Sequence, residues 1–215
     1  MLPADENHLS LPFADRESAA TLLAEKIRGK IKTCTIVLAV PRGGVVTGKV
    51  LAKILGLELD LILCKKVGHP ANPEYAIGSV CADGYAVQTD HSLPSYQNHF
   101  IRQSQILAAQ LSERYKLLTG KTAPAGLKNK EVLICDDGAA TGSTLLAAVS
   151  IAKQQGAEKI SVAVPVMSET ASNALNKICN HIFCLDIPTH FGAVGEYYIH
   201  FPTVEDDVVK HLLQT

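Results

Sequence analysis

The sequence predicts an α/β fold, in which a mostly parallel central sheet has helices on both faces. Short runs of apolar, strand-forming residues alternate along the chain with longer segments of helical periodicity. The apolar runs are continuous, as expected for strands that are buried on both faces. Glycine, proline and small polar residues separate the segments. This strand–helix alternation favours parallel strands that are joined by crossover helices.

Six segments have the apolar spacing and the terminal residues of helices. Asp15 is a suitable N-cap for the first of them, which is expected to end at Gly29. Its inner face would consist of Ala19, Leu22, Leu23 and Ile27. In the second helix Val46 and Val50 would face inward, and Gly56 would end the helix. The six expected helices span residues 15–29, 44–55, 98–118, 142–155, 168–178 and 205–213.

Strands are predicted from five apolar runs, at residues 35–40, 59–64, 132–135, 160–164 and 181–185. Residues 76–80 and 85–87 flank Asp83-Gly84, so they are expected to form a β-hairpin that adds a small hood to the central sheet. Between the second strand and this hairpin, a cluster of glycine, proline and asparagine over residues 68–73 predicts a loop without regular structure.

Length and composition narrow the classes of function. The 215 residues are expected to form one domain, residues 1–215, with an extended segment over residues 1–12. The 20 Lys and Arg residues balance 21 Asp and Glu residues, and aromatic residues are few, so neither nucleic acid nor a membrane is an expected partner. No apolar run reaches the roughly 20 residues of a membrane-spanning helix. Six cysteines, several within apolar runs, predict a protein of the reducing cytoplasm.

Residues 132–144, Val-Leu-Ile-Cys-Asp-Asp-Gly-Ala-Ala-Thr-Gly-Ser-Thr, are the most informative part of the sequence. A buried strand ends in two carboxylates, and a turn of small residues leads into a helix. Free amides at a helix start, with hydroxyl groups beside them, can bind phosphate. Gly138 and Gly142 would let an anion approach the backbone closely. Asp136 and Asp137 suit the vicinal hydroxyls of a sugar, directly or through a cation, so the segment predicts a sugar phosphate as ligand.

This segment resembles the sugar-phosphate loop of the type I phosphoribosyltransferases, and the resemblance implies their fold. In that family the loop binds the 5-phosphate and ribose of phosphoribosyl pyrophosphate. The resemblance implies that Asp136 and Asp137 orient the ribose as catalytic residues and contact Mg²⁺ indirectly, through ribose or water. Residues 140–144 would hold the 5-phosphate. The complete expected loop is Asp136, Asp137, Gly138, Ala139, Ala140, Thr141, Gly142, Ser143 and Thr144.

A second motif, Pro41-Arg-Gly-Gly44, follows the first expected strand. Its glycines expose backbone amides, and Arg42 supplies a planar guanidinium. In the family this loop receives pyrophosphate, which implies a catalytic role for Arg42. Two lysines after the second strand would add positive charge beside the leaving group. The expected pyrophosphate ligands are Arg42, Gly43, Gly44, Lys65 and Lys66.

Two further segments extend the resemblance over most of the chain. Residues 67–75 correspond to the mobile loop that covers the site in this family and excludes water. The runs Asn-Pro-Glu-Tyr-Ala-Ile-Gly and Phe-Gly-Ala-Val-Gly-Glu-Tyr-Tyr-Ile-His-Phe, at residues 72–78 and 191–201, resemble a subgroup of uncharacterised phosphoribosyltransferase-like proteins. Candidates to act from the loop are Asn72, Glu74 and Tyr75. Candidates to cover an acceptor base, or to pack in the core, are Phe191, Tyr197 and Tyr198.

The resemblance implies transfer of the phosphoribosyl group of phosphoribosyl pyrophosphate to a nitrogenous base or another nitrogen nucleophile, with release of pyrophosphate. Purine-salvage relatives place a third acidic residue just before the Thr-Gly pair, where this chain has Ala140. That departure argues against the hypoxanthine–guanine type. Members of the family are often dimeric, so the resemblance also allows a homodimer.

Two other functions are compatible with these residues. A regulator that binds phosphoribosyl pyrophosphate without catalysing transfer would need the same loops. A P-loop nucleotide hydrolase is suggested by Gly-Gly-Val-Val-Thr-Gly-Lys at residues 43–49, after a strand. Val50 then stands where that motif needs a hydroxyl group for magnesium, and Lys49 is expected to point away from the site. The transferase interpretation is therefore favoured.

Overall fold

A computed structural model describes residues 11–89 and 96–214. Its centre is a five-stranded sheet in the order β2-β1-β6-β7-β8. All four pairs of neighbouring strands are parallel. This confirms the predicted fold class. The strands are β1 (Ile36–Ala39), β2 (Glu58–Leu61), β6 (Glu131–Cys135), β7 (Lys159–Val166) and β8 (His181–Asp186).

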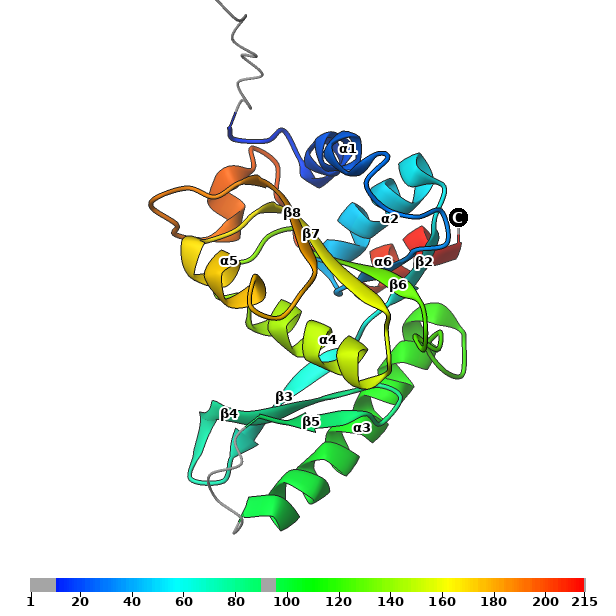
Figure 1. Ribbon diagram of the computed structural model, residues 1–215, viewed down its shortest axis with the longest axis vertical. Coiled ribbons are helices and arrows are strands. Elements are labelled where there is room, and N and C mark those ends of the chain that lie inside the picture. The colour runs from blue at the N-terminus through cyan, green and yellow to red at the C-terminus, as the bar shows by residue number, and fades with distance from the viewer. Residues whose placement is uncertain (1–10, 90–95, 215) are drawn as a thin grey trace, which may run out of the picture.

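Helices cover both faces of this main sheet (Figure 1). Val37 and Leu133 pack with α1 and α2 on one face, whereas Leu38 and Ile134 pack with α4 and α5 on the other. Because the strands are buried on both faces, their sequences are the continuous apolar runs from which they were predicted. The four helices are α1 (Arg16–Ile27), α2 (Gly43–Leu55), α4 (Ser143–Gln154) and α5 (Glu169–Leu175).

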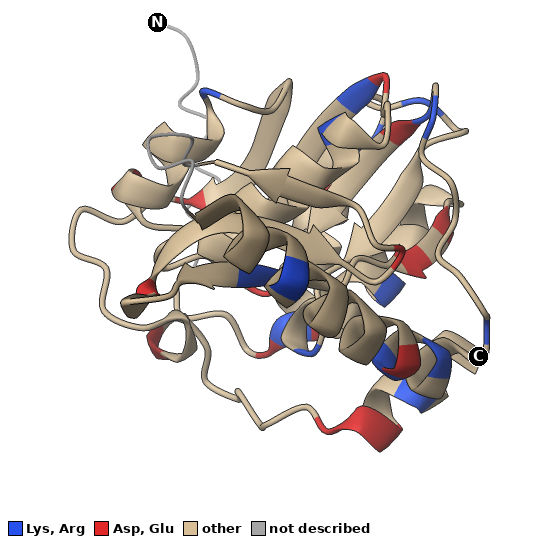
Figure 2. Cartoon of the chain, turned by 90° about the horizontal axis from the view of Figure 1, so that it is seen from below, with Lys and Arg blue, Asp and Glu red and all other residues tan. Residues whose placement is uncertain are grey.

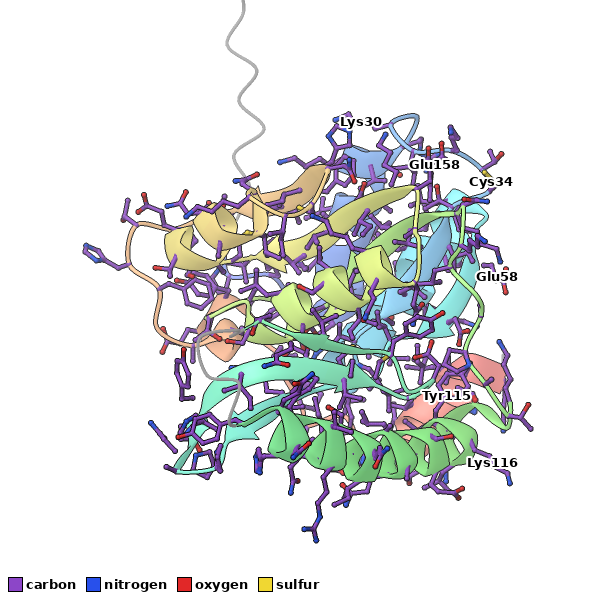
Figure 3. The ribbon with its side chains drawn as sticks, turned by 60° about the horizontal axis from the view of Figure 1, so that its bottom comes forward. Lys30, Cys34, Glu58, Tyr115, Lys116 and Glu158 are labelled. Carbon is purple, nitrogen blue, oxygen red and sulfur yellow. The ribbon has the colours of Figure 1, made fainter. Side chains whose placement is uncertain are left out.

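A three-stranded antiparallel sheet, in the order β3-β4-β5, lies against α3 below the main sheet in Figure 1. We call residues 64–89 and 97–119 the hood. Tyr115 lies on α3, where Figure 3 labels it. Its hydroxyl donates a hydrogen bond of 2.6 Å to Asp60 of β2, and both side chains are buried, so this bond links the hood to the main sheet. The hood consists of β3 (Cys64–His69), β4 (Asn72–Cys81), β5 (Ala86–Gln88) and α3 (Gln97–Thr119).

The C-terminal segment returns to the beginning of the described chain. It contains a short 3-10 helix, η2 (Val194–Tyr197), and the helix α6 (Asp206–Gln214). Phe13 forms a parallel β-bridge with Tyr198, and its amide donates to the carbonyl of Tyr197. The segments at the two ends of the described chain are therefore packed together.

The structure corrects the predicted course of residues 59–75. β2 ends at Leu61, and Cys64 begins a hood strand, so the two lysines that follow lie within β3 and not after a strand of the main sheet. Residues 67–75 form the ends of β3 and β4 with a turn at residues 70–71 between them, so most of this segment has regular structure. Gly68 pairs with Ala76 but His69 pairs with Asn72, so the residues between bulge outward from the hairpin. A Cβ atom on Gly68 would collide with the backbone of Pro73, so this close approach of β4 to β3 requires glycine at position 68.

Two helix faces also differ from the prediction. Leu22 is 46% exposed, because the inner face of α1 is centred on Leu23. In α2 the buried residues include Val45, Gly48 and Leu51, whereas Val46 and Val50 are half-buried. A Cβ atom on Gly48 would lie 2.8 Å from that of Ala39, so the helix is turned to bring its glycine onto the sheet.

The end of one expected helix also differs, and one expected segment is not tested. α5 ends at Leu175, before the expected residue 178. Most of the expected extended segment, residues 1–10, lies outside the described residues.

Candidate functional site

The two predicted loops leave the main sheet side by side. β1 and β6 are neighbours, and Ala39 pairs with Cys135 at their C-terminal ends. Residues 41–44 follow β1 after Val40 and lead into α2, and residues 136–144 follow β6 and lead into α4. The peptide bond between Pro41 and Arg42 is cis. Both loops therefore lie at the carboxyl edge of the sheet, where α/β proteins of this kind bind their ligands.

Gly43 and Gly44 contact the acidic pair. A Cβ atom on Gly44 would lie 2.8 Å from Cα of Asp136 and 2.9 Å from its Oδ1 atom. A Cβ atom on Gly43 would overlap the carboxylate of Asp137. Any side chain at either position would therefore displace an aspartate. The glycines allow the two loops to touch, and their predicted contact with pyrophosphate through the backbone stays a prediction.

Asp137 is held by an arginine that the sequence analysis did not select. Arg16 begins α1, and its Nε atom donates a hydrogen bond of 2.7 Å to Oδ2 of Asp137. The two side chains are only 8% and 14% exposed. The guanidinium also lies 3.6 Å from the ring centroid of Phe201 and donates to the carbonyl of Pro202. One carboxylate oxygen of Asp137 is thus occupied, so a contact with ribose, which stays a prediction, would use Oδ1.

Asp136 has a different environment from its neighbour. Its Oδ1 atom accepts a hydrogen bond of 2.9 Å from the Asp137 amide. Burial, and next the charge of Asp137, raise the pKa of Asp136 well above its ordinary value. Hydrogen bonds from a sugar diol would favour the ionised form of this carboxyl group. A sugar diol bound at Asp136 would therefore lower the pKa of this carboxyl group.

The loop before α4 offers amide groups to an anion. Gly142 is the N-cap of α4, with φ +67° and no side chain capping the helix. The amide of Ser143 donates to the hydroxyl of Thr141 at 3.3 Å. In the part of the chain that the structure describes, the amides of Thr141, Gly142 and Thr144 find no acceptor. These amides and the neighbouring hydroxyl groups are available to a phosphate.

The rest of this loop is fixed by α5 and the C-terminal segment. Ser168 donates from its amide to the carbonyl of Ala139 and from its hydroxyl to the carbonyl of Ala140. The space beside Gly138 is filled by Val194, and that beside Gly142 by Ala171. Packing therefore accounts for both glycines, and their expected contact with an anion stays a prediction.

A pocket of about 280 Å³ opens beside the loop of Arg42. Arg42, Lys65 and Arg114 line it, together with Thr144 from the first turn of α4. Lys and Arg segments are interspersed with Asp and Glu segments in Figure 2, so the positive charge is a local property of this pocket. The structure thus brings Arg42 and Lys65 together as predicted. Arg114 was missed, because in the sequence it resembles any other exposed residue of a long helix.

Lys66 does not share this pocket. Neighbouring residues of a strand point to opposite faces, so Lys66 lines a second pocket, of about 250 Å³, on the other side of β3. Ser143 and Ser150 of α4 line that pocket from one side, and Ser79 of the hood from another. The structure therefore separates the two lysines that the sequence analysis grouped.

The aromatic and loop candidates lie apart from these pockets. Tyr198 is 5% exposed and packs against Phe13 and Phe201, so it is a core residue. The rings of Phe191 and Tyr197 pack against each other at a centroid distance of 5.0 Å. The loop candidates are exposed at the end of the β3–β4 hairpin, namely Asn72, Glu74 and Tyr75.

The P-loop interpretation does not agree with the structure. α2 begins at Gly43, so residues 43–49 are helical and form no loop around a phosphate. Lys49 lines a different pocket, together with Lys53 and Leu57. The helix also begins too early for its lysine to reach the carboxyl edge of the sheet.

Comparison with known proteins decides the family. A family model described as a phosphoribosyl transferase domain matches residues 15–201. The chain belongs to the phosphoribosyltransferase family. This confirms the resemblance that was found in the sequence.

Relatives in this phosphoribosyltransferase family include two curated proteins of Mycobacterium tuberculosis, from two strains, which are provisionally named as phosphoribosyl transferases. Each is 32% identical over 213 residues, and the match covers 94% of this chain and 46% of the relative. The chain therefore spans about half the length of the curated relatives it matches. The crystal structure of the protein TT1426 from Thermus thermophilus has a TM-score of 0.85 and 37% identity, with 94% of this chain and 98% of that chain covered.

Among the described residues of this member of the phosphoribosyltransferase family, none of the helices has the length and apolar character needed to span a membrane.

Proposed function

We propose that this phosphoribosyltransferase binds phosphoribosyl pyrophosphate with Mg²⁺ and transfers the phosphoribosyl group to a nitrogen nucleophile, releasing pyrophosphate. The contact of Gly43 and Gly44 with Asp136 and Asp137 carries the proposal. This contact brings together, at one edge of the sheet, amides that can donate hydrogen bonds to a phosphate, an acidic pair and a pocket lined by three cationic side chains. A sugar that bears a phosphate at one end and a pyrophosphate at the other carries a partner for each of these groups.

Each part of the substrate then has its own residues. The 5-phosphate would accept hydrogen bonds from the amides and hydroxyl groups of Thr141 and Thr144 at the start of α4. The ribose hydroxyls would donate to Asp136 and to the unoccupied oxygen of Asp137. The pyrophosphate would lie against Arg42 and Lys65, which line the pocket beside Thr144.

Transfer breaks the bond between the anomeric carbon of ribose and the pyrophosphate oxygen, and the electron pair leaves with pyrophosphate. A bond forms between that carbon and the nitrogen of the acceptor, which loses its proton to water or to the departing pyrophosphate. Arg42 and Lys65 lower the barrier because their charge is aimed at the oxygen on which negative charge develops. Once the substrate is bound these cations would already lie beside the leaving group, so little further reorganisation would accompany the charge transfer.

We expect Mg²⁺ to be bound here mainly by oxygen atoms of the substrate and not by a set of protein side chains. Over residues 11–89 and 96–214, no three His, Cys, Asp or Glu side chains gather into a metal site. Asp137 is engaged by Arg16, which leaves Asp136 as the carboxylate best able to reach the ion through water. Mg²⁺ commonly keeps several waters and binds mainly to substrate phosphates, and in such a position it neutralises the charge of the leaving group.

The acceptor is defined only as a nitrogen nucleophile. Ala140 is exposed at the position where purine-salvage relatives carry an acid, and its carbonyl accepts a hydrogen bond from Ser168. Its side chain therefore contributes neither a base nor a hydrogen bond to an acceptor. The cytoplasmic location and the homodimer stay predictions, as does the absence of a nucleic-acid partner.

The test is a panel of purine and pyrimidine bases incubated with phosphoribosyl pyrophosphate and Mg²⁺, with pyrophosphate release as the measurement. Asp136→Asn should weaken equilibrium binding of phosphoribosyl pyrophosphate about tenfold, because hydrogen bonds to a charged group are lost. Asp207→Asn is the control, since Asp207 is exposed on α6. Tight binding without release across the panel would favour a regulator, and unchanged binding by Asp136→Asn would contradict the proposed ribose contact.

A further inference from the structure

Two guanidinium groups of the cationic pocket are paired with consecutive acidic residues. Arg42 donates from an Nη atom to Oε2 of Glu205 at 2.7 Å, and Arg114 donates to Oδ1 of Asp206 at 2.8 Å. The arginines come from the loop after β1 and from α3, whereas both acids lie where α6 begins. A single acidic turn is thus paired with two arginines that come from separate elements and line the same pocket.

These ion pairs are exposed. The side chains of Arg42 and Glu205 are 40% and 61% exposed, and those of Arg114 and Asp206 are 42% and 32% exposed. Exposed ion pairs of this kind contribute little to stability, because water screens the charges and holding two long side chains costs entropy. A ligand with more negative charge and two or more acceptor oxygens can replace such carboxylates.

Replacement needs no movement of the helix itself. Val204 and Val209, on either side of the acidic turn, are 7% and 0% exposed and hold the start of α6 on the core. Glu205 and Asp206 project from this anchored turn, so rotation of their side chains is enough to uncover the arginines. With the carboxylates turned away, Arg42, Arg114 and Lys65 would all be free to face the pocket.

We propose that Arg42 and Arg114 form a two-guanidinium clamp for the pyrophosphate group, and that Glu205 and Asp206 occupy the clamp until the ligand displaces them. This inference rests on the proposed function, because it assigns the pyrophosphate end of the same substrate. It adds Arg114 as a binding residue from α3 and gives the acidic turn a role in substrate affinity. The planar guanidinium groups suit a diphosphate, since each can donate two parallel hydrogen bonds to phosphate oxygens.

The first test is titration calorimetry of the full chain with inorganic pyrophosphate. Arg114→Gln should weaken binding about tenfold, because charge-assisted hydrogen bonds to the ligand are lost. Arg102→Gln is the matched control, since Arg102 is exposed on the same helix and does not line the pocket. It should bind like the unchanged protein. Equal affinities of the Arg114→Gln and Arg102→Gln variants would overturn the clamp.

The second test removes the competing carboxylate. Asp206→Asn should bind pyrophosphate several times more tightly, because the ligand no longer displaces an anion from Arg114. Asp207→Asn changes the same charge on the same turn and should have a smaller effect, since Asp207 is exposed and pairs with neither arginine. In the Arg114→Gln background the effect of Asp206→Asn should disappear, as a double-mutant cycle requires of residues that act through one another. If the effects of Asp206→Asn and Arg114→Gln on pyrophosphate affinity were additive, the proposal that Asp206 occupies the clamp would be overturned.

Ribose 5-phosphate separates this inference from the proposed function. It carries no pyrophosphate, so the Arg114→Gln variant should bind it as the unchanged protein does. Binding of ribose 5-phosphate together with unaltered pyrophosphate affinity in Arg114→Gln overturns the clamp alone. If the unchanged protein binds neither inorganic pyrophosphate nor ribose 5-phosphate, both the clamp and the proposed function are overturned.

Discussion

Arg16 and Asp137 form an ion pair of 2.7 Å that joins α1 to the loop after β6, across 121 positions of the sequence. Both side chains are largely buried, at 8% and 14% exposure. Arg16 also stacks on Phe201, so the pair ties the first helix, the acidic loop and the C-terminal segment together. The acidic loop is therefore positioned by residues from both ends of the described chain.

Arg16→Ala should lower the free energy of unfolding by about 3–5 kcal/mol, because it leaves the buried carboxylate of Asp137 without its cation. Urea denaturation followed by circular dichroism measures this change. Arg28→Ala is the matched control, since Arg28 pairs with Glu25 at 2.8 Å on the exposed side of the same region. That exposed pair should contribute less than about 1 kcal/mol. Equal destabilisation by the two substitutions would show that the Arg16 pair is not structurally important.

Gly44→Ala should destabilise the protein by about 1–3 kcal/mol, since the added methyl group would press on the backbone of Cys135 and Asp136. It should also weaken binding of phosphoribosyl pyrophosphate, because the two loops would be forced apart. Gly126→Ala is the control, as a Cβ atom there meets nothing within 4 Å and the backbone has no positive φ. A fully active and stable Gly44→Ala variant would contradict the close contact of the loops.

The strands of the main sheet could be predicted because each is a short, continuous apolar run. The same property hid the boundary between β2 and β3. Residues 61–64 are apolar throughout, and Ile62 and Leu63 are buried although they belong to neither strand. Hydrophobic pattern alone cannot show that the chain leaves one sheet there and enters another. Lys65 and Lys66 were consequently placed after a strand when they lie within one.

The residues of the candidate site also fall into two groups, those that the sequence predicted and those that only the fold reveals. Asp136, Asp137 and Arg42 belong to local motifs, so neighbouring residues in the sequence were enough to select them. Arg16 and Arg114 are far from these motifs, and only the fold brings them to the acidic pair and to the pocket. Their side chains give no local pattern, because a single arginine on an amphipathic helix is usually solvated.

Lys32→Gln should lower the melting temperature slightly at pH 7 and less at more acidic pH. Lys32 contacts Glu131 at 2.7 Å, and this bond lowers the pKa of Glu131 below its ordinary value of 4.5. A lowered carboxyl pKa stabilises the fold above the ordinary pKa, and this stability is lost as the pH falls through the folded-state pKa. Lys30→Gln, an exposed neighbour labelled in Figure 3, is the control. If the difference in melting temperature between Lys32→Gln and Lys30→Gln stayed constant from pH 7 to below pH 4, the stabilising role of the Lys32–Glu131 pair would be contradicted.

We expect Cys34 to react with thiol reagents faster than the other five cysteines. All six are free, and Cys34 is exposed at the periphery of the molecule in Figure 3. Burial raises the pKa of Cys64 and of Cys184 to about 12, and it also raises the pKa values of Cys135, Cys81 and Cys179.

Because the thiolate is the reactive form, a disulfide reagent such as dithiobis-nitrobenzoate at pH 8 should modify one thiol rapidly in the native protein. The remaining five should react fast only after denaturation. Cys34→Ser should abolish the rapid phase and leave the melting temperature nearly unchanged, as expected for an exposed residue. A rapid phase of one thiol that persists in Cys34→Ser would contradict the assignment of that phase to Cys34.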